Sequence, residues 1–252
     1  MMKVTAFIGS ARKKHTYHTT VDFLKKLQSL GDDLEYETVI LSDYNLQVCK
    51  GCLLCLDKGE EFCPSKDDRD KLINKMMDSD GIVWATPNYS FQVSAIMKTF
   101  LDRLGFVFHR PRFFGKTSTC IVAQGIYGGK DIVKYLNFVG RGMGFNVVKG
   151  CYITTREPIT EKAGKKNERK IDKLSRKFYA RLVKKEYPVP SLFELMIFRM
   201  SRKGIHGSLN ETYRDYTYYR EQGWFESDYF YPVKLNLFKK LTGKIFDKMP
   251  VN

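Results

Sequence analysis

The first 150 residues alternate short apolar runs with segments whose apolar residues recur at helical spacing, and this alternation constrains the fold most strongly. Strands are predicted at residues 4–8, 36–41, 81–85, 117–123 and 146–152. Helices are predicted between them, at residues 21–27, 71–77, 93–108 and 130–141. The run GIVWA at residues 81–85 is apolar throughout, which is typical of a strand covered on both faces. The pattern predicts an α/β fold with a doubly wound, five-stranded parallel sheet and right-handed crossovers.

The loop after the first predicted strand is suited to a phosphate group. Ligands of such sheets bind at the carboxyl ends of the strands, where this loop lies. Its sequence, GSARKKHTYHTT, has neither the G-x-G-x-x-G fingerprint nor the Walker lysine pattern. It leads into a helix N-terminus, which attracts anions, and its candidate ligands are Ser10, Arg12, His15 and Thr16. The alternative is a capped helix start decorated with basic residues.

The loops after the third and fourth predicted strands are suited to a flat aromatic ring. The first of them, TPNYSFQVS, offers backbone hydrogen bonds and stacking from Pro87, Asn88, Tyr89, Ser90 and Phe91. The second, AQGIYGG, lets the backbone approach a ligand closely, because it contains Gly125, Gly128 and Gly129. One phosphate loop and two ring loops on the same edge of a sheet together predict an FMN site.

A dense group of cysteines lies in the segment CKGCLLCLDKGEEFC. Of the six cysteines in the chain, this segment holds Cys49, Cys52, Cys55 and Cys63. Thiolates at this density are typical of zinc, an iron–sulfur cluster or redox chemistry. Zinc sites more often show two well-separated pairs of ligands, which this segment lacks. Ordinary reduced cysteines in a tight loop are the alternative, and the spacing leaves both interpretations open.

The composition is that of a chain with a substantial core and a strong positive charge. The hydrophobic content is 43% and the formal net charge is +15. No apolar run approaches the ~20 residues of a membrane span, and the N-terminus does not have the pattern of a signal peptide. The remaining cysteines lie in strand-like runs, so a cytoplasmic, reducing compartment is expected. The positive charge favours phosphate-bearing or other polyanionic partners, or serves only as a solvated surface.

The C-terminal third is predicted to be mainly helical, basic and aromatic. One basic helix carries an apolar stripe expected to pack on the sheet, formed by Ile171, Leu174, Phe178 and Leu182. Ser191 and Glu194 form a capping-box pattern before LFELMIFRM, which is expected to be a short, buried helix. A final amphipathic stretch is expected to place on one side Phe238, Leu241, Ile245 and Phe246.

Two domains are predicted, at residues 1–187 and 188–252. The second is interpreted as an extension that covers the first domain or forms a homodimer or higher-oligomer interface. Attachment to a membrane surface is a weaker alternative, because basic and apolar faces coincide at the C-terminus. Nucleic acid is the least favoured partner, since no recognition module is present in the sequence.

Three motifs in the right order make the chain resemble a known family. GSARK, TPNYSFQVSAIMKTFLDRLG and CKGCLLCLDKGEEFCPSKDD are similar to segments of the NADPH-dependent FMN reductase family of flavodoxin-like proteins, and within it of the iron–sulfur flavoproteins. The resemblance covers about residues 1 to 155. Two departures lie in the phosphate loop: Ala11 stands where proline is usual, and the loop is one residue shorter, with His15 and Thr16 where Gly-Asn-Thr is usual.

The resemblance implies a flavodoxin-like fold, non-covalent FMN, and reduction by NADPH or NADH. No catalytic side chain is assigned, because hydride transfer takes place on the flavin and the protein supplies position and electrostatics. In the iron–sulfur branch the cysteine segment carries a [4Fe–4S] cluster. The predicted function is an oxidoreductase that passes electrons to a flavin, quinone or protein acceptor. The alternatives are an electron carrier with that cluster and a non-enzymatic flavin- or redox-sensing protein.

Overall fold

The structure is a computed structural model that describes residues 1–250. The chain divides into two compact units, each built from separate stretches of sequence. The first unit contains Met1–Cys49, Asp67–Leu104 and Gly115–Lys185, and the second contains Lys50–Lys66, Gly105–Phe114 and the residues from Glu186 onward. The C-terminal region therefore forms one unit with part of the cysteine segment and with a short stretch that precedes the fourth strand.

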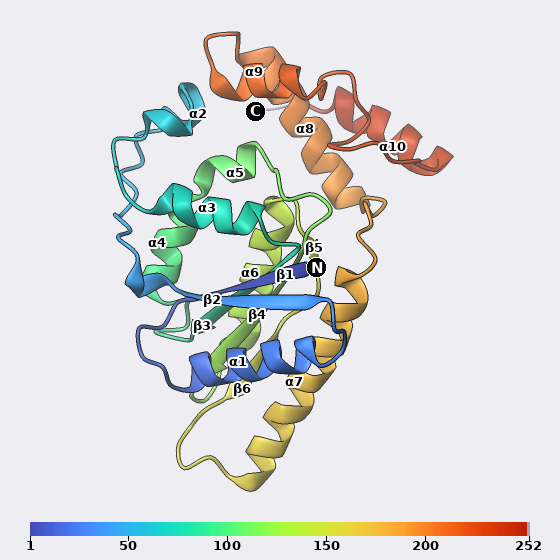
Figure 1. Ribbon diagram of the computed structural model, residues 1–252. Helices are drawn as coiled ribbons and strands as arrows, with labels where there is room; N and C mark the ends of the chain where they lie inside the picture. The colour runs from blue at the N-terminus through green and yellow to red at the C-terminus, as the bar shows by residue number, and fades with distance from the viewer. Residues whose placement is uncertain (251–252) are drawn as a thin grey trace. The chain divides into compact units, whose positions relative to one another are not determined.

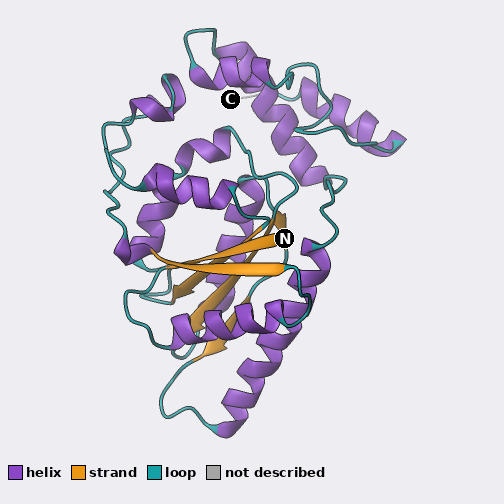
Figure 2. Cartoon of the chain, viewed as in Figure 1, coloured by secondary structure: helices purple, strands orange, loops and turns teal. Residues whose placement is uncertain are grey.

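The first unit is built on a parallel sheet, as predicted (Figures 1 and 2). The strand order is β2-β1-β3-β4-β5, and β6 also pairs with β4. The strands are β1 Met2–Ile8, β2 Leu34–Ile40, β3 Gly81–Pro87, β4 Thr117–Gln124, β5 Asn146–Val147 and β6 Cys151–Thr154. Every residue of β3 and β4 is buried, which explains why most of their side chains are apolar or small. The doubly wound, flavodoxin-like fold class is confirmed.

The predicted strand at residues 146–152 is wrong in one respect, because the structure divides it into β5 and β6. Both pieces pair with β4 in parallel, at Thr117–Ser118 and at Ile121–Gln124. Between them, Gly150 lies so close to β4 that a Cβ atom would stand 2.3 Å from both the carbonyl oxygen and Sγ of Cys120. The strand is interrupted where its backbone makes this close approach.

Helices cover both faces of this sheet (Figure 1). The helices of the first unit are α1 His15–Gln28, α3 Arg69–Met77, α4 Ala95–Arg103, α6 Gly129–Gly142 and α7 Glu161–Leu182, with a 3₁₀ turn at Leu41–Asp43. The rings of Phe23 in α1 and Phe178 in α7 lie 5.7 Å apart in one core cluster. Phe7 of β1 packs instead against Phe100 of α4, at 5.4 Å. The predicted apolar stripe of α7 is confirmed, since all four of its residues are buried.

The single helix predicted at residues 93–108 is also wrong. The structure has α4, which ends at Arg103, and a separate short helix α5 at Gly105–His109. The backbone N–H of Leu104 donates to the carbonyl of Leu101, so the end of α4 tightens, and Gly105 follows as a weak helix former. Apolar periodicity alone does not reveal this break.

The second unit is helical. Besides α5 it contains α2 Leu54–Asp57, a 3₁₀ turn at Glu60–Phe62, α8 Leu192–Ser208, α9 Arg214–Glu221 and α10 Leu237–Lys248. Its core is largely aromatic and is formed by Leu195, Phe198, Tyr219, Trp224, Tyr229 and Leu235. The capping box of Ser191 and Glu194 is confirmed. The expectation of a short, buried helix after it is wrong, because α8 runs to Ser208 and exposes Phe193 and Ile197.

Within the described part of the chain, no helix combines the length and the apolar character needed to cross a lipid bilayer.

Candidate functional site

The loop after β1 approaches the start of α4 closely and leads into α1. A Cβ atom at Gly9 would lie 2.7 Å from Oγ of Ser94, so only glycine fits there without a shift. The hydroxyl of Ser10 donates to the carbonyl of Arg12 at 3.0 Å. Helix α1 then begins at His15 without a side-chain cap and without an acidic residue in its first turn. Its positive N-terminal end therefore faces this loop without a neutralising carboxylate from its own first turn.

The loop after β3 is held in a tight turn. The backbone N–H groups of Tyr89 and Gln92 donate to each other's carbonyls at 3.0 Å. Ser90 and Phe91 between them have φ values of 49° and 63°, a conformation that residues other than glycine rarely adopt. Asn88 ties this loop to the next one, because its backbone N–H donates to Ala123 at 2.7 Å and its Nδ2 to the carbonyl of Tyr127 at 2.8 Å.

The loop after β4 is organised by the side chain of Gln124. Its Nε2 donates to the carbonyl of Ile126 at 2.9 Å, and its Oε1 accepts from the N–H of Gly129 at 2.7 Å. Gly128 has a φ of 95° and is the residue immediately before α6, so the loop runs directly into this helix. The rings of Phe91 and Tyr127 lie 5.0 Å apart, so the loops after β3 and β4 form one exposed aromatic rim.

The loops after β1, β3 and β4 enclose a pocket of about 170 Å³. The predicted site residues that line it are Ser10, Arg12, His15, Thr16, Pro87, Asn88, Tyr89 and Gly125. The other predicted ring-loop residues lie outside this lining, namely Ser90, Phe91, Gly128 and Gly129. Three further residues line the pocket that the sequence did not indicate: Lys14, Ala123 and Thr155.

Thr155 lies in the loop after the last strand, where the sequence shows no binding motif. Its backbone N–H and its hydroxyl both donate to the carbonyl of Gln124, at 2.8 and 3.0 Å. Its position in the chain could have indicated it as a site residue. Thr155 follows the carboxyl end of β6, and parallel strands end at the same edge of the sheet.

The pocket is suited to an anion. Arg12, Lys14 and His15 line it, and none of its lining residues is acidic. Nε2 of His15 contacts Oε1 of Glu157 at 2.8 Å, and the guanidinium of Arg12 reaches the hydroxyl of Tyr89 at 3.5 Å. An anion bound here would be surrounded by cationic side chains and hydroxyls.

One buried polar atom points to a ligand beside the pocket. Oδ1 of Asn88 is buried and has no hydrogen-bond partner among residues 1–250. A buried carbonyl of this kind is costly to leave unpaired, and a ring N–H would satisfy it. At Gly125 nothing lies within 4 Å of the place where a Cβ atom would stand, which leaves room for a close ligand. These features fit a cofactor such as FMN, which carries both a phosphate and a flat ring with an N–H group.

The predicted metal ligands are not gathered in the structure. Cys49 and Cys52 are exposed, Cys55 is half-buried and Cys63 is buried. Among residues 1–250, no three His, Cys, Asp or Glu side chains form a group that could hold a metal ion. The segment is sharply bent, since Gly51, Leu53 and Gly59 all have positive φ values.

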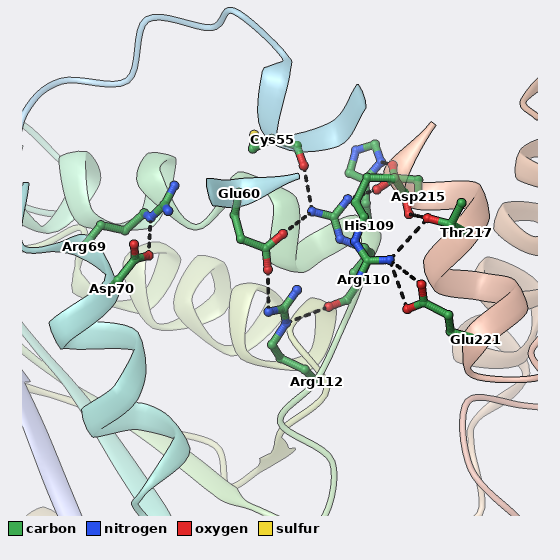
Figure 3. A network of polar contacts seen from close by, with 11 residues as sticks. Cys55, Glu60, Arg69, Asp70, His109, Arg110, Arg112, Asp215, Thr217 and Glu221 are labelled. Atoms are coloured by element: carbon green, nitrogen blue, oxygen red, sulfur yellow. Dashed lines mark hydrogen bonds and ion pairs between the residues drawn. The ribbon is translucent and has the colours of Figure 1, made fainter. Parts of the chain in front are cut away.

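A buried arginine anchors the cysteine segment within the second unit (Figure 3). The guanidinium of Arg110 is fully buried and donates to the backbone carbonyl of Cys55 at 2.7 Å and to the carboxylate of Glu60 at 2.8 Å. It also pairs with Asp215, whose carboxylate contacts Nδ1 of His109 at 2.8 Å. Arg110 therefore links the C-terminal region to the cysteine segment through its hydrogen bonds and ion pairs.

Glu60 completes this network (Figure 3). Its second carboxylate oxygen accepts from Arg112 at 2.8 Å. Burial alone would raise the pKa of the Glu60 carboxyl, but the hydrogen bond and charge of Arg112 and the charge of Arg110 outweigh it and hold that pKa below its ordinary value. Glu60 therefore remains ionised between two arginines.

A family model described as NADPH-dependent FMN reductase matches residues 2–157, which include the whole sheet and all the loops of the pocket. The chain belongs to the NADPH-dependent FMN reductase family. Within this family it is similar to an iron–sulfur flavoprotein of Archaeoglobus fulgidus, with 31% identity over 225 residues, 88% of this chain and 100% of that protein. An iron–sulfur flavoprotein of Clostridioides difficile is 28% identical over 78% of this chain and 86% of its own length.

Solved structures of other proteins share the fold of this FMN reductase family member. RosB, solved with a bound 8-demethyl-8-formylriboflavin-5'-phosphate intermediate, superposes with a TM-score of 0.59 over 94% of this chain and 92% of its own, at 15% identity. The azoreductase AzrA superposes with a TM-score of 0.56 over 71% of this chain and 99% of its own, at 14% identity. At these identities the likeness concerns the fold alone.

Proposed function

We propose that this FMN reductase family member is an NAD(P)H-dependent flavoprotein oxidoreductase that holds FMN at the carboxyl edge of its sheet. The observation that carries the proposal is the meeting of a cationic pocket and an aromatic rim on the same three loops. Bound FMN supplies the ring that takes a hydride from the nicotinamide and passes electrons to an acceptor. The residues of this chain act by binding and orienting that ring.

Each loop has a distinct task in this proposal. Arg12 and the N-terminus of α1 hold the phosphate, and Thr16, buried at the bottom of the loop, offers its hydroxyl. The amide of Asn88 fixes one edge of the ring through its otherwise unpaired Oδ1. Gly125 leaves space for the ring to approach the backbone. No catalytic side chain is assigned, because positioning and electrostatics suffice for hydride transfer between stacked rings.

Access to the outer face of the ring decides which acceptors can react. Tyr89, Ile126 and Tyr127 are exposed on the rim, so the site is open to a second planar molecule. We propose that NADPH or NADH enters there first, and that a free flavin, a quinone or a partner protein then takes the electrons. A homodimer or higher oligomer remains a prediction for which sedimentation velocity is the direct measurement.

Steady-state turnover tests this function. Purified protein loaded with FMN is mixed with NADPH or NADH and with a quinone or free FMN as acceptor, and nicotinamide oxidation is followed by its absorbance. Acceptor-dependent turnover is expected. FMN bound tightly without turnover on any of these acceptors would contradict the enzyme and support a flavin-sensing protein instead.

We also propose, as a second candidate function, electron transfer through a [4Fe–4S] cluster on Cys49, Cys52, Cys55 and Cys63. The close spacing of these cysteines and the similarity to proteins named iron–sulfur flavoproteins favour it. Because the thiols are apart in this structure, the bent segment would have to rearrange around the cluster.

Iron and acid-labile sulfide measured on protein purified without oxygen test the cluster. About four of each per chain are expected, and a Cys52→Ser variant should lose both. Cys120→Ser is the control, since this buried thiol lies in β4, outside the segment. Absence of iron from the wild-type protein after reconstitution with iron and sulfide would contradict the cluster and leave the flavin proposal standing.

A further inference from the structure

The last helix of the second unit turns its apolar side outward. In α10 the side chains of Leu237, Phe238, Leu241 and Ile245 are each more than half exposed. Their spacing of one, three and four residues places them on one face of the helix. We refer to these four side chains as the outer apolar row. A row of large exposed apolar side chains on one helix is unusual for a surface that faces only water.

The opposite side of α10 is held in place by small and charged residues. Gly243 is buried, and a Cβ atom there would lie 3.4 Å from the guanidinium of Arg199 in α8. Asp247 pairs with Arg199 at 2.8 Å and with Arg202 at 2.5 Å. Arg199 is nearly fully buried. Turning α10 about its axis to bury the outer apolar row would remove Asp247 from Arg199 and leave this buried charge with fewer partners. The sequence-based expectation that Phe246 shares the apolar side is wrong, because Phe246 packs against the aromatic core.

Positive charge accompanies the outer apolar row. Lys240, Lys244 and Lys248 are exposed along the same helix. Its single acidic residue, Asp247, is on the inner side and is paired with Arg199 and Arg202. The exposed part of α10 is therefore apolar and cationic together, which is the composition of a helix that lies in the interface of an anionic bilayer.

We propose that α10 attaches this protein to the surface of an anionic lipid bilayer, with the outer apolar row inserted among the acyl chains and the lysines at the headgroups. A second copy of the chain fits this face less well. In a two-fold pairing through α10, each copy would bring its lysines near those of the other, and the exposed side of α10 itself carries no acidic residue to balance them. The proposal depends on α10 and α8 alone and is independent of flavin binding.

Sedimentation with vesicles tests this attachment. Full-length protein is mixed with vesicles of phosphatidylcholine, or of phosphatidylcholine with an equal share of phosphatidylglycerol. It is expected to sediment with the anionic vesicles and to remain in solution with the neutral ones. Lys240→Gln/Lys244→Gln should lower the partition coefficient by about thirtyfold, because each lysine near an anionic surface contributes about 1 kcal/mol. Leu241→Ser/Ile245→Ser should abolish sedimentation, and near-ultraviolet circular dichroism should show that its fold is unchanged.

Lys166→Gln/Lys173→Gln is the matched control, because it removes the same charge from exposed positions of α7 and should bind as the wild type does. Equal binding to both kinds of vesicle, or binding that survives Leu241→Ser/Ile245→Ser, would overturn the proposal. So would the absence of vesicle binding, and sedimentation velocity would then show whether Leu241→Ser/Ile245→Ser dissociates a dimer built on this face.

Discussion

Arg12 is the side chain on which we expect phosphate binding to depend most. It lines the pocket together with Lys14 and His15 and reaches Tyr89 across it. A hydrogen bond between charged groups contributes about 1.5–3 kcal/mol, so Arg12→Ala should weaken FMN binding by about tenfold to a hundredfold. Titration of the flavin-free protein with FMN, followed by flavin fluorescence, measures the dissociation constant.

The matched control for this variant is Arg169→Ala, which removes an exposed arginine from α7, outside the pocket. Its affinity for FMN should equal that of the wild type. An unchanged dissociation constant for Arg12→Ala would show that the phosphate is bound elsewhere.

Asp67 makes the stability of the first unit depend on pH. Its buried carboxylate accepts from Arg103 at 2.9 Å and from the backbone N–H of Gln47 at 2.9 Å. Burial alone would raise the pKa of this carboxyl, but these hydrogen bonds outweigh burial and hold the pKa below its ordinary value of 3.8. The unfolded chain therefore takes up this proton at a higher pH than the folded chain does.

The stabilisation from Asp67 should be complete above about pH 4 to 5 and lost as the pH falls through the lower, folded-state pKa. Urea unfolding at a series of pH values from neutral downward measures this loss. As the pH falls, the free energy of unfolding of Asp67→Asn should decrease less than that of the wild type. The exposed control Asp32→Asn should show the same pH dependence as the wild type. Parallel curves for Asp67→Asn and the wild type would contradict this account.

At the scale of elements, Gly150 explains the division between β5 and β6. An alanine Cβ there would meet the backbone and Sγ of Cys120 at 2.3 Å, so Gly150→Ala should destabilise the protein by about 1–3 kcal/mol. Gly164→Ala is the control, because Gly164 lies in α7 with nothing within 4 Å of its added methyl group. That variant should gain about 0.5–1 kcal/mol. Urea unfolding measures both, and equal stability of the two variants would refute the role given to Gly150.

The elements that the sequence predicted well are those with strong periodicity. The fully apolar run of β3 and the stripe of Ile171, Leu174, Phe178 and Leu182 in α7 follow from burial on a sheet. The breaks at Gly105 and Gly150 could not be predicted in this way. They depend on a tightened helix end and on contact with Cys120, neither of which changes the local apolar pattern. The orientation of α10 depends on ion pairs with α8, so periodicity identified an apolar side without showing that it faces outward.

At the scale of the whole molecule, the C-terminal region completes a unit that contains part of the cysteine segment. Phe114 packs against Phe230 and Tyr231 at 5.3 Å, and Arg110 pairs with Asp215. Deleting residues 188–252 should therefore expose aromatic surface and leave Arg110 with fewer partners, and the shortened protein should aggregate. Size-exclusion chromatography measures this, and a soluble truncated protein with wild-type FMN content would contradict it.

The pocket was more predictable than the division into units. Strand ends meet at one edge of a parallel sheet, so the loops of Ser10, Asn88 and Gly125 could be brought together from the sequence. The second unit joins residues 50–66, 105–114 and those from 186 onward through the partners of Arg110. The local sequence pattern does not predict such contacts between distant segments.

The visible absorption spectrum of protein purified without oxygen, recorded before and after addition of NADPH, tests the central claim most directly. The proposed function predicts flavin bands equivalent to about one FMN per chain, which bleach when NADPH is added and return with an acceptor. Protein that neither retains nor takes up flavin, or flavin bands that NADPH leaves unchanged while dithionite bleaches them, would contradict it.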